Sequence, residues 1–126
     1  MSKQKPAAAC AHREYSGKSY FCAVELALRI IGGKWKTIIL WHLSPDGGKR
    51  YGELKRAIPN VTQKMLTQQL RELEADGMIR RVVHAQVPPK VEYSLTELGN
   101  SVLPVLKQLS AWGLRFEAMI KAQSAA

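Results

Sequence analysis

The stretch from Thr62 to Asp76 holds the side chains of this chain that are best suited to reading DNA. At 100° per residue, a helix over this stretch would place Lys64, Gln68 and Arg71 on one face. The opposite side would be an apolar stripe formed by Leu66, Leu70 and Leu73. Lysine and arginine suit phosphates and guanine edges, and glutamine can form two hydrogen bonds with adenine. The pattern therefore predicts a helix for the major groove, although an ordinary surface helix would also leave such a face in solvent.

The two thiols, Cys10 and Cys22, are the second candidate for chemistry, and they are too few for a disulfide framework. Cys22 is expected at or just before a helix N-terminus in a basic chain, and both features favour the reactive thiolate. Cys10 lies in a polar stretch, from which it could act as a resolving thiol. The alternative is that Cys22 is a small apolar residue and that Cys10 has no role.

The other polar residues predict no catalytic, cofactor or metal site. His12, His42 and His84 are scattered, and their spacing fits neither a nucleophilic triad nor a pair of catalytic carboxylates. Cys10 and His12 lie close together, but no second pair of metal ligands follows them. We therefore expect no enzyme activity, no metal and no cofactor.

Composition and charge limit the fold and the partner. A chain of 126 residues with 46% hydrophobic content can bury one core. Its formal net charge of +9 favours a polyanion, because basic side chains release counterions from a phosphate backbone. Nucleic acid is the first candidate, and an anionic membrane surface is the second. No apolar run is long enough to cross a bilayer and no secretory signal is recognisable, so we expect a cytoplasmic protein without a membrane partner.

The chain divides into an arm and one domain. Residues 1–19 are polar and show neither helical nor strand periodicity, which predicts a mobile arm. Residues 20–123 would form the domain. Its first two helices are expected from Cys22 to Ile31 and from about Lys34 to Leu43, where apolar residues recur at helical spacing.

A helix-turn-helix would follow these two helices. A short helix from Tyr51 to Ala57 leads into Pro59 and Asn60, which favour a turn. Thr62 can then cap the next helix at its N-terminus, and Gly77 can end it in the left-handed conformation. In this arrangement the first helix of the motif supports the second against DNA.

Two predicted strands come next, from Met78 to Val87 and from Val91 to Leu95. Pro88-Pro89-Lys90 would connect them, because proline cannot donate to a sheet ladder. A hairpin directly after a reading helix is the wing of a winged helix. Lys90 at its tip is expected to touch the DNA backbone or the minor groove. For Arg80 and Arg81 near its base, DNA contact and plain solvation are both open.

The last helix is expected to begin at Thr96 and to carry more apolar surface than its own domain needs. Its apolar residues recur at intervals of three and four: Leu98, Val102, Val105, Leu109, Trp112, Phe116 and Ile120. Leu103, Leu106 and Leu114 add a second flank. This excess predicts a partner chain, and Pro104 predicts a bend.

Several motifs of the chain, in this order and spacing, resemble the HxlR family of bacterial transcriptional regulators. They are Cys22 shortly before Val24-Glu25, Ile31-Gly32-Gly33-Lys34-Trp35-Lys36, Arg50-Tyr51-Gly52-Glu53-Leu54, the run from Leu66 to Gly77, the run from Val87 to Thr96, and Gly99. The resemblance implies a winged helix-turn-helix, a homodimer built from the first and last helices, and a palindromic operator. It also implies an oxidant or small-molecule signal, since some members sense oxidants, quinones or aldehydes at the position of Cys22. Ala23 stands where many members have proline, so the start of the first helix is expected to differ.

Together these observations predict a mainly α protein with a small β-hairpin, an α+β winged helix-turn-helix that dimerises through its first and last helices. It would act as a DNA-binding transcriptional regulator, a repressor of a neighbouring gene, on double-stranded operator DNA. The DNA-binding residues are expected to be Thr62, Gln63, Lys64, Thr67, Gln68, Arg71, Arg50 and Lys90. The alternative is a winged-helix module for protein interaction or RNA binding, but the predicted reading face shows neither the apolar anchors nor the stacking aromatics that these partners need.

Overall fold

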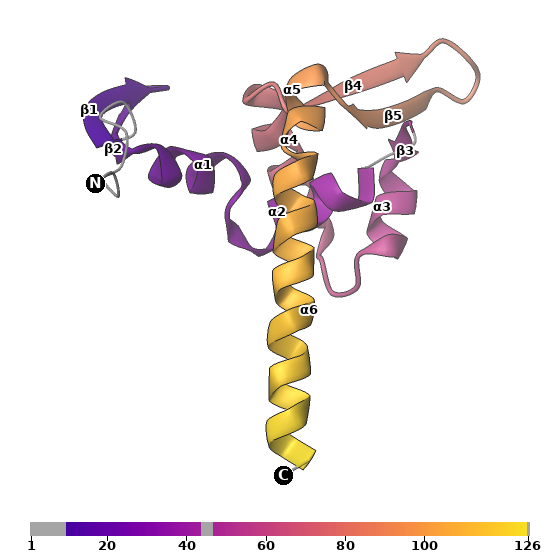
Figure 1. Ribbon diagram of the computed structural model, residues 1–126. Coiled ribbons are helices and arrows are strands. Elements are labelled where there is room, and N and C mark those ends of the chain that lie inside the picture. Colours follow the sequence, from indigo (N-terminus) through magenta and orange to yellow (C-terminus); the bar gives the residue numbers. More distant parts are fainter. Residues whose placement is uncertain (1–9, 44–46, 126) are drawn as a thin grey trace.

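The computed structural model describes residues 10–43 and 47–125, and it is mainly helical with two small antiparallel sheets (Figure 1). The elements, in chain order, are β1 (Cys10–Tyr15), β2 (Lys18–Cys22), α1 (Ala23–Ile31), α2 (Gly33–Leu43), β3 (Lys49–Arg50), α3 (Tyr51–Ala57), α4 (Gln63–Ala75), β4 (Ile79–His84), β5 (Lys90–Leu95), α5 (Glu97–Ser101) and α6 (Leu103–Ala125). Within the described ranges, no helix is both long enough and apolar enough to cross a membrane. The predicted winged helix-turn-helix is confirmed.

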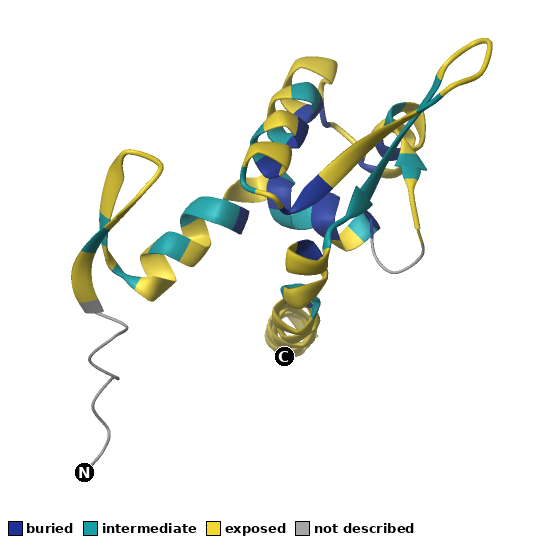
Figure 2. Cartoon of the chain, turned by 90° about the horizontal axis from the view of Figure 1, so that it is seen from above, coloured by how far each residue is buried: buried dark blue, intermediate teal, exposed yellow. Residues whose placement is uncertain are grey.

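One apolar core holds α2, α3 and α4 against the three-stranded sheet. The leucine stripe predicted for α4 is fully buried: Leu66, Leu70 and Leu73 are each at most 2% exposed. They pack in one cluster with residues of α2 and α3, among them Ile39, Leu40, Leu43 and Leu54. Figure 2 shows the buried positions, in dark blue, gathered where the helices meet the sheet. On the other side of α4, Lys64, Gln68 and Arg71 are exposed.

Both ends of α4 are fixed as the sequence predicts. The Thr62 hydroxyl accepts a hydrogen bond of 3.1 Å from the backbone N–H of Met65, which satisfies one free donor of the first turn. At the other end, Gly77 has a φ of +78°. Its N–H donates to Glu74, and the N–H of Met78 donates to Leu73, which is the hydrogen-bond pattern of a Schellman motif.

The wing is a three-stranded sheet in the order β3-β5-β4. The sequence does not predict β3, because two residues, Lys49 and Arg50, are too short for a periodic signal. They pair with Tyr93 and Glu92 of β5. The prediction that Lys90 belongs to the connection is also wrong: Lys90 is the first residue of β5 and pairs with His84, so residues 85–89 form the wing tip.

The expectation that residues 1–19 lack regular structure is wrong from Cys10 onward, where β1 and β2 form a hairpin. The turn is made by Ser16 and Gly17, whose φ values of +54° and +79° are those of a type I′ turn. Ser16-Gly17 is a turn-forming dipeptide, but without an alternating apolar pattern around it the sequence does not predict the strands on either side. Residues 1–9 lie outside the described part, and the boundary between an arm and a domain stays a prediction.

The prediction of a single last helix with a bend at Pro104 is also wrong. The chain forms two helices, α5 and α6, which are separated at Val102. Pro104 has no backbone N–H, and its ring collides with the carbonyl group four residues earlier, so it takes the second position of α6 instead. Only Leu106 of α6 is buried in the core. Beyond Leu106, α6 projects from the domain (Figure 1), and residues 107–125 are exposed (Figure 2).

Candidate nucleic-acid interface

The predicted reading face forms one surface of α4. Five of its side chains line a single open hollow of about 550 Å³: Gln63, Lys64, Thr67, Gln68 and Arg71. All five belong to α4, whose buried leucines hold the opposite side of the helix against the core. The hollow therefore presents two cations, two amides and a hydroxyl on a helix that cannot rotate without exposing its apolar stripe.

The hydroxyl groups of two threonines in this region form hydrogen bonds within the protein. Thr62 is exposed, but its oxygen accepts the hydrogen bond that caps α4. Thr67 is half-buried, and its hydroxyl lies 3.2 Å from the hydroxyl of Tyr51. Tyr51 also donates a hydrogen bond of 3.0 Å to the carbonyl oxygen of Gln63. This tyrosine of α3 thus fixes the angle between the two helices of the motif, a role that no sequence pattern indicated.

Glu72 connects the reading face to the core helix α2. Its carboxylate accepts a hydrogen bond of 2.7 Å from the Gln68 amide and forms an ion pair of 2.7 Å with the Lys36 ammonium. The Gln68 hydrogen bond and the Lys36 charge hold the pKa of Glu72 below its usual value. Lys36 is the one charged residue buried in the described part of the chain. Gln68 therefore has a defined orientation, because its amide is held by the Glu72 carboxylate.

Arg50 and Lys90, the two predicted contacts outside α4, lie on neighbouring strands of the wing. Arg50 ends β3 and is exposed, with its backbone N–H bonded to Glu53 at 2.7 Å. The Lys90 ammonium is 3.5 Å from Glu92, which His84 also contacts at 2.8 Å. The His84 hydrogen bond, followed by the nearby Lys90, lowers the pKa of Glu92. Lys90 is thus partly neutralised at the base of the wing tip.

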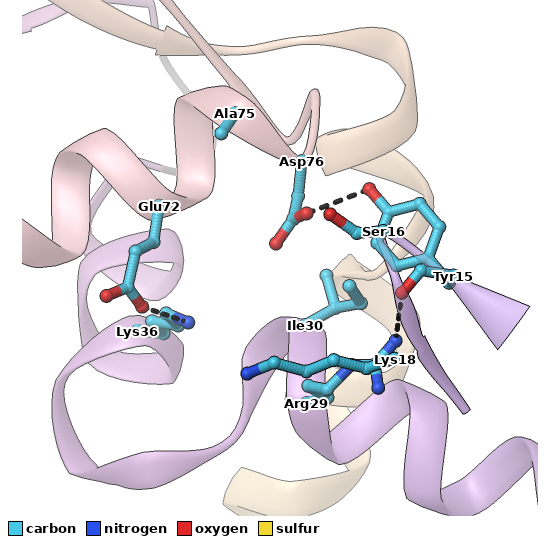
Figure 3. Close-up of a pocket in the computed structure, with 9 residues that line it drawn as sticks. All are labelled: Tyr15, Ser16, Lys18, Arg29, Ile30, Lys36, Glu72, Ala75 and Asp76. Carbon is cyan, nitrogen blue, oxygen red and sulfur yellow. Dashed lines mark hydrogen bonds and ion pairs between the residues drawn. The ribbon is translucent and has the colours of Figure 1, made fainter. Parts of the chain in front are cut away.

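The N-terminal hairpin contacts the last turn of α4 (Figure 3). The Tyr15 hydroxyl donates a hydrogen bond of 2.8 Å to Asp76, and Arg29 of α1 donates one of 2.8 Å to the Tyr15 carbonyl oxygen. A pocket of about 250 Å³ lies between the hairpin, α1, α2 and α4. The hairpin is thereby linked to the same helix that carries the reading face.

Cys22 lies where this hairpin meets α1, half-buried at the N-cap position of the helix. The Glu25 carboxylate accepts the backbone N–H groups of Phe21 and Cys22 at 2.8 and 3.5 Å. Those hydrogen bonds lower the pKa of Glu25, and the resulting negative charge opposes the effect of the helix N-terminus on a thiolate. In the register of β1 and β2, the backbone of Cys22 pairs with that of Cys10; the Cys10 side chain lies outside the described part.

The described residues contain no group of three or more His, Cys, Asp or Glu side chains placed to hold a metal ion. The charged side chains that do gather are those of the α4 face, the wing and the hairpin contact. Within the described residues, none of these arrangements places a nucleophile beside a base.

Comparison with known proteins matches the chain to one family. The family described as HxlR-like helix-turn-helix matches residues 30–121. The HTH-type transcriptional regulator YtcD of Bacillus subtilis (strain 168) is 62% identical over 96 residues, which cover 76% of this chain and 75% of that protein. The redox regulator HypR in its reduced form has a TM-score of 0.74 at 51% identity and covers 79% of this chain and 98% of its own. The reduced transcriptional regulator YodB from B. subtilis has a TM-score of 0.67 at 37% identity, over 75% of this chain and 91% of its own.

Proposed function

The chain belongs to the HxlR-like helix-turn-helix family and is a transcriptional regulator, and from this premise we propose that it represses a gene by binding a pseudo-palindromic operator as a homodimer. The observation that carries the proposal is the α4 surface, where Lys64, Gln68 and Arg71 line one hollow, and Arg71 also lines the adjoining cleft with wing residues. Lysine and arginine suit guanine edges and phosphates, and glutamine suits adenine. We expect the protein to act in the cytoplasm, where its DNA partner lies.

The exposed apolar surface supports the homodimer. Large apolar side chains are exposed on both α1 and α6: Val24, Leu28, Val105, Leu109, Trp112, Leu114, Phe116, Met119 and Ile120. On α6, Trp112 and Phe116 stack with ring centroids 5.5 Å apart, although they are 61% and 44% exposed. Exposed apolar residues in this number are typical of a protein interface. In a dimer the two α4 helices would lie about 34 Å apart, one turn of B-DNA.

The test is selection of duplexes from a random-sequence pool, followed by gel-shift titration. We expect an enriched motif with two-fold symmetry and half-sites about 10 base pairs apart, centre to centre. Arg71→Ala and Lys64→Ala should weaken binding to this motif. If the lost contact is to a base, the binding free energy should fall by about 1–3 kcal/mol. If it is to a phosphate, the slope of log K against log salt should fall by about one. Lys107→Ala, which removes the same charge from exposed α6, is the control and should bind like wild type. A pool without an enriched symmetric motif contradicts the proposal.

We also propose that oxidation of Cys22 regulates DNA binding. HypR is a redox regulator by its description, and Cys22 stands at the end of the hairpin whose Tyr15 contacts α4. A chemical change at Cys22 can therefore reach the reading helix through the hairpin. Treatment with hydrogen peroxide should change operator affinity in wild type and leave Cys22→Ser unaffected. An equal response of the serine variant would remove Cys22 from the regulation.

A further inference from the structure

A second basic cleft lies between α4 and the wing. It has a volume of about 390 Å³ and is lined by Thr67, Leu70, Arg71, Glu74, Arg81 and Tyr93. Thr67 and Arg71 line both this cleft and the hollow of the predicted reading face. The two concave surfaces are therefore adjacent, and they share the side of α4 that faces the wing.

Strand geometry places Arg80 and Arg81 on opposite faces of β4, a difference that the sequence alone does not show. Side chains alternate between the two faces of a strand, so Arg81 shares the face of the buried Ile79, while Arg80 lies on the other face. Arg81 pairs across the ladder with Tyr93, and both residues line the cleft. Arg80 pairs with Ser94 outside it.

The charges in the cleft are available to a ligand. Arg71 and Arg81 are both exposed, and neither they nor Glu74 takes part in the ion pairs found within the described residues. Two guanidinium groups and one carboxylate leave the cleft with a net charge of one positive unit. Guanidinium groups bind phosphate through pairs of parallel hydrogen bonds, and the Tyr93 hydroxyl supplies a further donor.

We propose that this cleft binds a backbone phosphate of the DNA duplex, held between Arg71 of α4 and Arg81 of β4. This inference rests on the proposed DNA binding and adds a site to it. The phosphate belongs to the strand that borders the major groove where α4 lies, because the cleft opens beside the same face of α4. The contact positions the protein on the duplex and reads no sequence.

The experiment compares Arg81→Ala with Arg80→Ala, two adjacent substitutions that remove the same charge from opposite faces of one strand. The probe is a fluorescein-labelled duplex of mixed sequence, about 24 base pairs long so that it spans two half-sites. Its affinity is measured by fluorescence anisotropy at several salt concentrations between roughly 50 and 200 mM. Arg81→Ala should bind roughly tenfold more weakly and lower the slope of log K against log salt by about 0.9 for each chain bound. Arg80→Ala should change neither quantity appreciably.

Glu74→Gln should have the opposite effect on the affinity for the duplex. The substitution removes the one carboxylate of the cleft, and binding should become tighter because no negative charge then repels the phosphate. Equal effects of Arg80→Ala and Arg81→Ala would overturn the phosphate site, since they would reflect bulk charge alone. Wild-type protein that fails to bind any duplex would overturn the proposed function itself, so the two failures are distinguishable.

Discussion

Gly99 lies so close to Met78 that a Cβ atom built on it would stand 2.1 Å from the Met78 carbonyl oxygen. The same carbonyl group accepts hydrogen bonds from the Thr96 N–H and hydroxyl, both at 3.1 Å. Met78 is the residue at which the chain leaves α4 and enters the wing. The start of α5 therefore fixes the junction between α4 and the wing, and it does so through a contact that only glycine permits.

Gly99→Ala should destabilise the fold by roughly 1–3 kcal/mol, because the added methyl group meets a backbone oxygen that cannot move freely. Urea unfolding followed by circular dichroism measures the change. Gly113→Ala is the matched control, since a Cβ atom at Gly113 meets nothing within 4 Å. In a helix interior that substitution should stabilise by up to about 1 kcal/mol. Equal stabilities of the two variants would show that the Gly99 contact does not constrain the junction.

Glu72→Gln should make the protein less stable at neutral pH and less sensitive to acid. Because the folded-state pKa of Glu72 is lowered, first by Gln68 and then by Lys36, its contribution is fully present above its unfolded value of about 4.3. That contribution is lost as the pH falls through the folded-state pKa. Melting temperatures of both proteins between about pH 7 and pH 3 should therefore converge at the acid end.

The control for this pH series is Glu74→Gln, the same chemical change at an exposed carboxylate of α4 without an ion pair in the described region. Its melting curve should stay parallel to that of wild type over the whole range. If Glu72→Gln also runs parallel to wild type, the ion pair with Lys36 does not contribute to stability.

Tyr15→Phe should release the N-terminal hairpin from α4 without unfolding the domain. The hydrogen bond to Asp76 is the first cause of the raised pKa of Tyr15, so the contact is present at neutral pH and is lost as the pH rises through that raised value. Amide hydrogen exchange of residues 10–22 should be faster in the variant, and exchange in the α2–α4 core should not change. Tyr20→Phe is the control, because no hydrogen bond of the Tyr20 hydroxyl is found within the described residues.

The helix-turn-helix could be predicted from the sequence because its signals are local. The leucine stripe of α4 has helical period, Thr62 can cap and Gly77 can end the helix, and each of these features depends on residues a few positions apart. The wing strands β4 and β5 were likewise indicated by β-branched residues on both sides of a proline pair. The helix bounds are confirmed within one or two residues, whereas β4 ends at His84, three residues before the predicted end at Val87.

What the sequence could not predict depends on contacts between distant residues. Tyr51 reaches Thr67, Lys36 reaches Glu72 and Tyr15 reaches Asp76, and no local spacing reports such pairs. Arg80 and Arg81 look equivalent in the sequence, since strand register alone determines which of them faces α4. The two-residue strand β3 is defined only by its pairing with the distant strand β5.

Trp112→Asp should convert the proposed dimer to monomers. The exposed side chains on one side of α6 follow a helical stripe, and Trp112 lies near its centre with Phe116 stacked on it at 5.5 Å. Burial of a charged carboxylate in such an apolar interface is costly unless it finds a partner. Light scattering coupled to size-exclusion chromatography should report twice the 14.1 kDa chain mass for wild type and a single chain mass for the variant.

Ala118→Asp introduces the same charge about 120° further around α6, outside the stripe, and should remain a dimer. Because one helix-turn-helix alone contacts only one half-site, Trp112→Asp should also lose affinity for a two-fold symmetric operator while its α4 surface remains intact. If both variants and wild type elute with the mass of one chain, α6 does not mediate dimerisation. If Trp112→Asp remains a dimer while Ala118→Asp dissociates, the interface lies on the other side of the helix, where Leu114 is 63% exposed.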